Sequence, residues 1–261
     1  MLLVKGIMDA SRLDAEAAAV RRRYDRREGG TGPNSIYHPL RLDRILVRYS
    51  KERLIAKRLR RDWLVNSFDA RVLEVGCGQG ANLSLFVSFG FEPRNLVGVE
   101  LLDERARRAR ELLPPEVAIH TGDATRAGFE PASFDIIIQS TVFSSILAPD
   151  VRAEVARQMW DWLKPGGNIL WYDLAVDNPK NPDVVGISRQ EIQELFPRAS
   201  FEFHRVTLAP PIGRLVIGIG GWLYQLLDSV PFLRSHTLAW GVKSAGGDES
   251  HLPRQPEGVS E

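Results

Sequence analysis

The sequence contains very little cysteine and no excess of charge of either sign. Its 261 residues include a single cysteine, Cys77, so neither an intramolecular disulfide nor a Cys-x-x-Cys metal site can form. The 34 Lys and Arg residues are balanced by 33 Asp and Glu residues. Binding to nucleic acid through counterion release needs a concentrated basic face, so this balance argues against a dedicated nucleic-acid-binding protein. The lone cysteine suits a reducing compartment.

Long hydrophobic runs are also missing. Residues 1–10 are too short and too polar for the apolar part of a signal peptide, so we expect a cytoplasmic protein. The most apolar segment, Pro210–Leu233, has a middle that is too short to cross a bilayer. We expect it to be a buried capping helix over the sheet or the ligand cleft. The alternative is an apolar wall for a hydrophobic or lipid-linked substrate, or a segment that rests on a membrane surface.

The sequence pattern changes near residue 70. Before it, the apolar spacing predicts two helices, 11–24 and 40–66, with a Gly/Pro/Asn break at 29–34. The arginine-rich end of the first helix is either a solvated face or a contact for an anionic ligand. The chain thus divides into three parts: an N-terminal helical segment (1–66), a core (67–243, with 210–233 as an apolar cap insertion) and a disordered tail (244–261).

Short apolar runs alternate with helical patterns in the core. The runs predict strands at 71–75, 95–100, 117–121, 134–139 and 168–173, and the helical stretches are 82–89, 103–113 and 150–163. This alternation indicates βαβ units, a parallel sheet and ligands at the carboxyl ends of the strands. The last part, with strands at 201–208 and 237–243, lacks an ordinary crossover helix.

A glycine-rich turn, Gly76-Cys77-Gly78-Gln79-Gly80, joins the first strand to a helix. Glycines there permit a tight turn and a close approach of the backbone to a nucleotide. The turn alone also satisfies the Gly-x-Gly-x-x-Ala dinucleotide fingerprint. Glu74, two residues before Gly76, would repel a pyrophosphate and suits a cationic ligand instead. Glu100 ends the next strand, where a carboxylate can accept ribose hydroxyls, and Asp123 follows the third strand, where it can accept from an adenine amine.

These motifs, with the Lys164-Pro165-Gly166-Gly167 turn before the fifth strand, resemble those of class I S-adenosylmethionine-dependent methyltransferases over about residues 69–243. The resemblance implies a Rossmann-like α/β fold with helices on both faces of a seven-stranded sheet, ordered 3-2-1-4-5-7-6 with strand 7 antiparallel. It also implies S-adenosylmethionine as cofactor and S-adenosylhomocysteine as product. The cofactor-binding residues it implies are Glu74, Gly76, Cys77, Gly78, Gly80, Glu100, Leu101, Asp123, Ala124 and Gln139.

Two alternatives to a methyltransferase stay open. A non-catalytic S-adenosylmethionine-binding partner protein would keep the same cofactor residues. An NAD-dependent oxidoreductase is disfavoured by Glu74 and, for the short-chain type, by the lack of a Tyr-x-x-x-Lys pair.

Missing motifs restrict the methyl acceptor. Cys77 lies inside the cofactor turn, so it cannot act as the nucleophile of cytosine C5 methylation. The Asn/Asp-Pro-Pro-aromatic motif of adenine N6 methylation is absent after the fourth strand, where Gln139 is also a poor Mg²⁺ ligand. We therefore expect a metal-free enzyme acting on a small molecule or a glycan, including a lipid-linked one, at a hydroxyl group. The segment around 210–233 is similar to methyltransferases of glycan assembly. The oligomeric state is left open.

Two residues are candidates for the catalytic base. Asp173 ends the fifth strand and either accepts a substrate proton or caps a turn. His38 precedes the core. N-terminal segments in the methyltransferase family that this sequence resembles commonly fold over the cofactor as a lid. His120 and His204 lie in expected strands and are interpreted as core residues.

Overall fold

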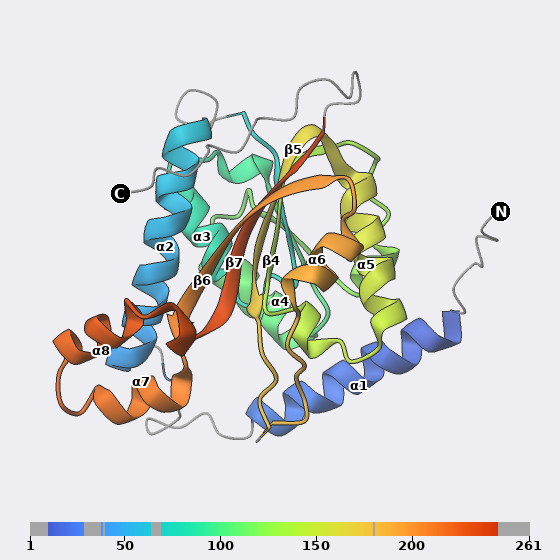
Figure 1. Ribbon diagram of the computed structural model, residues 1–261. Helices are drawn as coiled ribbons and strands as arrows, with labels where there is room; N and C mark the ends of the chain where they lie inside the picture. Colours follow the sequence, from blue (N-terminus) through green and yellow to red (C-terminus); the bar gives the residue numbers. More distant parts are fainter. Residues whose placement is uncertain (1–9, 29–37, 39, 64–68, 180, 245–261) are drawn as a thin grey trace.

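A computed structural model describes residues 10–28, 38, 40–63, 69–179 and 181–244, and shows one sheet with helices on both faces (Figure 1). The strands are β1 (Val72–Val75), β2 (Leu96–Glu100), β3 (Ala118–Thr121), β4 (Phe134–Ser140), β5 (Leu163–Leu174), β6 (Ala199–Leu208) and β7 (Arg234–Lys243). The α-helices are α1 (Ala10–Glu28), α2 (Leu42–Trp63), α3 (Ala81–Ser88), α4 (Asp103–Leu112), α5 (Pro149–Trp162), α6 (Arg189–Leu195), α7 (Pro210–Val216) and α8 (Gly221–Asp228). Four 3-10 helices are η1 (Pro93–Asn95), η2 (Ala124–Arg126), η3 (Phe143–Ser145) and η4 (Pro231–Leu233).

The strand order is β3-β2-β1-β4-β5-β7-β6. The pairs among β1 to β5 are parallel, whereas β7 is antiparallel to both of its neighbours. The expected topology is therefore confirmed. It follows that β1, β2 and β4 end side by side, so the residues after them meet at one edge of the sheet.

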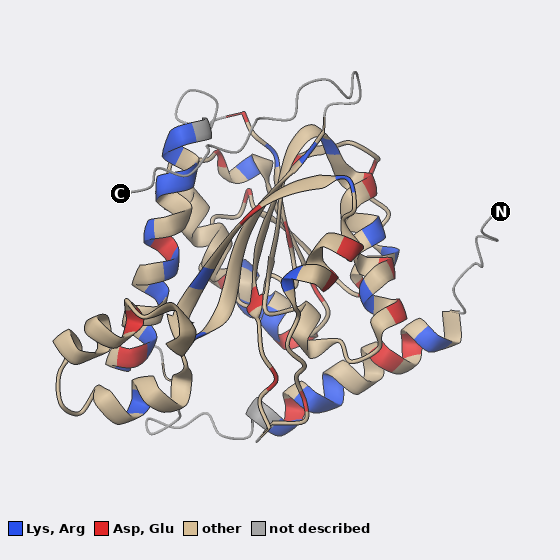
Figure 2. Cartoon of the chain, viewed as in Figure 1, with Lys and Arg blue, Asp and Glu red and all other residues tan. Residues whose placement is uncertain are grey.

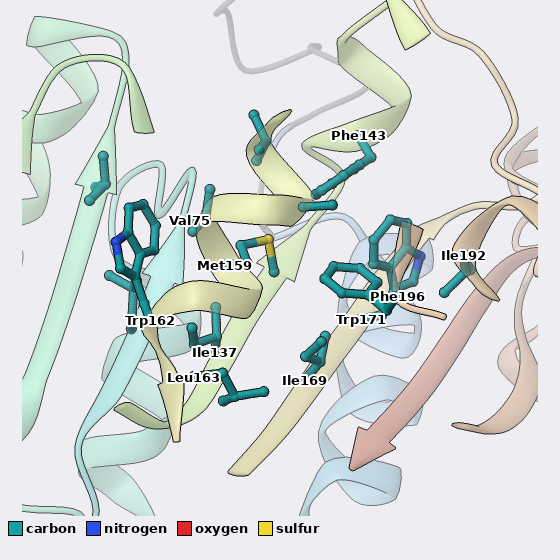
Figure 3. Close-up of a cluster of buried hydrophobic side chains, with 14 of the residues drawn as sticks. Val75, Ile137, Phe143, Met159, Trp162, Leu163, Ile169, Trp171, Ile192 and Phe196 are labelled. Atoms are coloured by element: carbon teal, nitrogen blue, oxygen red, sulfur yellow. The ribbon is translucent and has the colours of Figure 1, made fainter. Parts of the chain in front are cut away.

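Side chains of the central strands alternate between two buried layers. Leu73, Ile137 and Trp171 point into one layer, where they pack with α5 and with Phe143 and Phe196 (Figure 3). Their sequence neighbours point to the other face and pack with α2 and α3. A parallel sheet covered on both faces needs such continuous apolar runs, and these runs explain why β1, β2, β4 and β5 are visible in the sequence.

The first two helices agree with the expected pattern within a few residues at each end. α1 crosses the end of the sheet where the parallel strands finish, and α2 lies along one face (Figure 1). The break at 29–34 and the tail 245–261 lie outside the described residues. Asp135 has a structural role, since its carboxylate accepts from the Arg71 amide and from Lys164 Nζ.

The expectation of one buried capping helix at 210–233 is wrong. Gly218, Gly220 and Gly221 interrupt the segment, and it forms two short helices, α7 and α8, followed by η4. They pack beside β6 and the first half of α2. No helix in the described ranges is both long and apolar enough to cross a bilayer.

Two tryptophans provide a test of this packing. Trp171 is fully buried, so Trp171→Ala should lower the free energy of unfolding by about 3–5 kcal/mol. Trp222, on α8, is 65% exposed, and Trp222→Ala should change the free energy of unfolding by less than about 0.5 kcal/mol. Urea denaturation followed by circular dichroism measures both. A large loss of stability from Trp222→Ala would contradict its exposed position.

Candidate functional site

Side chains pack closely against the glycine-rich turn after β1 at two of its glycines, whereas the turn is open at the third. Gly76, Gly78 and Gly80 all have positive φ angles, of 67°, 54° and 84°. An added Cβ would collide with Val142 at Gly76 and with Leu113 at Gly80, so these two glycines are required by packing. At Gly78 the nearest atom to an added Cβ is 3.8 Å away, at the Arg105 guanidinium. Gly78 therefore forms the open part of the turn.

Cys77 contributes only its main chain to this turn. Its side chain is buried beside Gly98 and Ile119, and burial raises the pKa of the thiol far above its usual value. The Cys77 amide donates to the carbonyl of Val99. The buried side chain points away from the open part of the turn, so the cofactor contact expected of Cys77 stays a prediction for its main chain.

Glu100, at the end of β2, faces the same turn. Its two carboxylate oxygens accept from the amides of Gly78 (2.7 Å) and Leu102 (2.9 Å). A carboxylate has about four acceptor positions, so roughly two stay available for ribose hydroxyls. The carboxylate therefore both shapes the turn and retains the capacity expected of a ribose ligand.

A cavity of about 530 Å³ lies next to this acid, between α1 and the ends of β2 and β3. Leu101 and Asp123 line it, as expected for the adenine side, and α1 contributes Asp14 and Arg21. Asp123 Oδ1 accepts from both the amide and the hydroxyl of Thr125, which fixes the carboxylate at the start of η2. Ala124 follows in η2.

His120 lines the same cavity and is exposed on the edge strand β3, so its interpretation as a core residue is wrong. His204 is half-buried and pairs with Glu202 rather than lying in the core. Both errors arise because a strand near the sheet edge buries fewer of its side chains.

Glu74 begins a polar network that crosses one face of the sheet. Asn82 donates to Glu74 Oε1 at 2.5 Å, and Lys51 of α2 donates to Asn82 Oδ1 at 2.8 Å. Burial raises the pKa of Glu74 to about 8 and lowers the pKa of Lys51. Glu74 Oε2 is buried and has no hydrogen-bond partner among the described residues. A buried carboxylate oxygen in this state is suited to a cationic ligand.

The network continues to the aromatic ring of Tyr172 on β5. Lys51 Nζ lies 5.0 Å from the centre of that ring, and His236 stacks with the ring at 5.0 Å. The Tyr172 hydroxyl bonds to Thr207 Oγ1 at 2.8 Å. Thr207 has a positive φ of 66°, a strained conformation for a β-branched residue. The sequence analysis assigned no role in the site to Lys51 or His236.

Asp173 points to the opposite face of the sheet from Tyr172 and is fully buried. Its oxygens accept from the amides of Ser144 and Leu174, and burial raises its pKa to about 6. A base must reach the proton that it removes. The sequence allowed two roles for Asp173, a catalytic base and a turn cap. The geometry supports the turn cap and does not support the base.

The two remaining sequence candidates differ in position. Gln139, at the end of β4, is fully buried, and its Nε2 has no partner in the described part of the chain. His38 lies before α2, is half-buried and accepts from the Leu40 amide at 3.3 Å through Nδ1. Within the described residues, no three His, Cys, Asp or Glu side chains are grouped so that they could hold a metal ion.

The comparisons with known proteins agree with this geometry. Residues 72–167 match a family described as "Methyltransferase domain", a range that contains the glycine turn, Glu100 and Asp123. Residues 72–167 are thus a methyltransferase domain, and the sheet order is that of the class I S-adenosylmethionine-dependent methyltransferases. The cofactor of that class is S-adenosylmethionine. The open Gly78 backbone, Glu100, the Asp123 cavity and the unpaired Glu74 oxygen form a donor and acceptor set that fits it.

Individual relatives cover only part of the chain. A 2-methyl-6-phytyl-1,4-hydroquinone methyltransferase of Synechocystis is 32% identical over 39% of this chain and 31% of its own length. A phthiotriol/phenolphthiotriol dimycocerosates methyltransferase of Mycobacterium leprae is 30% identical over 51% of this chain and 48% of its own length. The chain thus spans about a third to a half of these relatives. A phosphoethanolamine N-methyltransferase 1 structure from Haemonchus contortus, solved with S-adenosylhomocysteine, aligns with a TM-score of 0.61 at 14% identity, covering 96% of this chain and 53% of that one.

The raised pKa of Glu74 makes cofactor binding dependent on pH. Below about pH 8 the neutral acid predominates in the free protein, whereas a cationic ligand favours the carboxylate. We expect the affinity for S-adenosylmethionine to rise from pH 6 to 8, by at most about tenfold per pH unit, and then to level off. Calorimetry across this range measures it.

Glu74→Gln is the test variant, and Glu194→Gln, on the exposed surface of α6, is its matched control. The first should bind more weakly and with a flat pH profile, and the second should behave as the wild type does. A wild-type affinity that does not change between pH 6 and 8 would contradict the assignment of Glu74.

Replacement of Asp173 separates its two roles. Asparagine can accept from only one of the two amides, so Asp173→Asn should cost about 1–3 kcal/mol of stability while cofactor affinity changes little. Urea denaturation and calorimetry measure the two quantities. Normal stability with abolished methyl transfer would instead restore Asp173 as the base.

Proposed function

We propose that this chain transfers a methyl group from S-adenosylmethionine to a hydroxyl group of a lipophilic small molecule, without a metal ion. A glycan, including a lipid-linked one, is the alternative acceptor. The observation that carries the proposal is the network from Glu74 to Tyr172. It places the cofactor-side acid and an aromatic wall on the same face of the sheet, at the edge where the parallel strands end.

The chemistry of this wall suits an apolar acceptor. Burial raises the pKa of Tyr172 to about 12 and lowers the pKa of His236 to about 4, so both rings are uncharged at neutral pH. Lys51 lies between Glu74 and this wall, since the charge of Glu74 opposes the lowering of its pKa by burial and its Nζ is 5.0 Å from the centre of the Tyr172 ring. The names of two relatives, acting on a phytyl hydroquinone and on phthiotriol dimycocerosates, favour the same class of acceptor.

The bound cofactor supplies an electrophilic methyl carbon on a sulfonium, and the protein has to place an acceptor oxygen in line with it. We assign the removal of the hydroxyl proton to His38. Its Nδ1 can take a proton after the contact with the Leu40 amide is broken, and at 3.3 Å that contact is weak. Leu40, which supplies the amide, lies two residues before α2, the helix that also supplies Lys51.

The N-terminal segment 1–66 has the role of a lid in this proposal. α1 lines the cavity at Asp123, and the Tyr24 hydroxyl lies 3.3 Å from Ser145 Oγ, so the helix is fastened across the strand ends. A lid excludes water from the reacting groups. We further propose that the chain acts in the cytoplasm and meets a lipophilic acceptor at a membrane surface.

Methyl transfer is tested with labelled S-adenosylmethionine and three acceptors: a prenylated hydroquinone, a long-chain alcohol and phosphoethanolamine. We expect the labelled methyl group on the hydroquinone or alcohol oxygen. His38→Ala should lower kcat by about 10²- to 10⁴-fold, because a positioned base contributes about that much, with cofactor affinity unchanged. His204→Ala, at an exposed pair with Glu202, is the matched control and should retain activity.

The same assay separates the alternatives. Binding of S-adenosylmethionine without any methylated product from lipid, glycan and metabolite panels would favour a non-catalytic binding protein. Tight binding of NAD in place of S-adenosylmethionine would favour an oxidoreductase. Transfer that requires added Mg²⁺, or that goes only to the amine, would overturn the metal-free hydroxyl assignment.

A further inference from the structure

The corner of the molecule formed by α7, α8 and η4 exposes large apolar side chains. Phe232 is 86% exposed and Leu215 is 78% exposed. The exposed set in this segment is Leu215, Ile219, Trp222, Leu226 and Phe232, which we call the α7–α8 face. A soluble surface seldom gathers so many large apolar side chains in one place unless they contact something.

The inward side of the same helices is already packed. Gly213, Val216 and Tyr224 are buried against β6 and α2. Trp222 and Leu226 are four residues apart on α8, so they form one outward stripe. The inward sides of α7 and α8 therefore make the contacts with the rest of the fold, and the side chains of the α7–α8 face take no part in them.

The charge around this face is strongly positive. Residues 40–54 and 205–234 contain eight Lys or Arg residues and three Asp or Glu residues, whereas the whole chain is nearly balanced. Each of the three acids has an arginine partner: Asp43 pairs with Arg41, Glu52 with Arg48 and Asp228 with Arg234. Figure 2 shows the mostly uncharged helices α7 and α8, which contain Arg214 and Asp228, beside the basic first half of α2.

We propose that the α7–α8 face docks on the surface of an anionic lipid bilayer. Trp222 and Phe232 enter the interfacial region, and arginines beside them, including Arg44 and Arg214, meet the phosphate groups. The helices lie in the plane of the interface, because each has only seven or eight residues.

A bilayer fits this surface better than a second copy of the chain does. A two-fold dimer through this face would bring the basic surroundings of both copies together at one interface, and like charges brought close are repulsive. An anionic surface instead matches both the apolar stripe and its basic surroundings.

The position of this face also suits the proposed function, although the docking does not depend on it. Leu208 packs in the small core under α7 and α8, and the adjacent Thr207 bonds to the Tyr172 hydroxyl. The docked surface would thus lie next to the aromatic wall of the acceptor site, where a lipophilic molecule leaves the bilayer.

Co-sedimentation with vesicles tests the proposal. The probes are vesicles of phosphatidylcholine alone and of equal parts phosphatidylcholine and phosphatidylglycerol, at low and high salt. We expect binding to the anionic vesicles at low salt. Trp222→Ala/Phe232→Ala should weaken it by about tenfold or more, and Arg44→Gln/Arg214→Gln by about fivefold per charge.

Leu112→Ala is the matched control, since Leu112 is exposed on α4, outside this corner, and its replacement should leave vesicle binding unchanged. Failure of the wild type to bind any vesicle, or unchanged binding by Trp222→Ala/Phe232→Ala, would overturn the proposal. A dimer in light scattering that the same double variant abolishes would assign the face to a second copy instead. Methylation of a short, water-soluble acceptor is measured in parallel, so that failure of docking and failure of the methyltransferase proposal are distinguishable.

Discussion

The burial of the Glu74 carboxylate is the constraint on which the site depends. Glu74 is 1% exposed, and a buried acid needs polar partners that replace water. Asn82 supplies one from α3, directly after the glycine turn, and Lys51 supplies a positive charge from α2. α2 is therefore held against β1 and α3 at the cofactor end of β1. This requirement fixes α2 to the core in addition to its apolar packing.

The position of α2 then determines the opposite end of the acceptor site. Its first half contributes Leu46 and Val47 to the small core that holds α7 and α8. The same helix places Lys51 over the Tyr172 ring. One helix therefore connects the Glu74 carboxylate, the aromatic wall and the basic apolar corner, and this connection explains why a segment before the methyltransferase domain belongs to the site.

The positions of the three acids proposed for the cofactor side could be predicted from the sequence because the signals are local. Glu74, Glu100 and Asp123 each stand at or just beyond the end of an apolar run, and parallel strands bring such positions together. Lys51 could not be predicted in this way, because a lysine on an arginine-rich amphipathic helix is ordinarily expected to be solvated. Asp173 shows a second limit. The end of β5 was located correctly, but successive side chains point to opposite faces, and the Glu74 network with the proposed acceptor site lies on the face of Tyr172.

The apolar segment after β6 can be interpreted only when its composition and its structure are considered together. Its sequence predicts burial, yet the glycines at 218, 220 and 221 divide it into helices of seven and eight residues whose inward sides bury only Gly213, Val216 and Tyr224. Large side chains are left in water, at a cost of roughly 1.5–3 kcal/mol for each one that could be buried. An enzyme with a polar, freely soluble acceptor would gain nothing from this surface. For an acceptor held in a membrane, the surface brings the acceptor site to its substrate, and so the exposed corner and the uncharged wall are best explained by the same class of molecule.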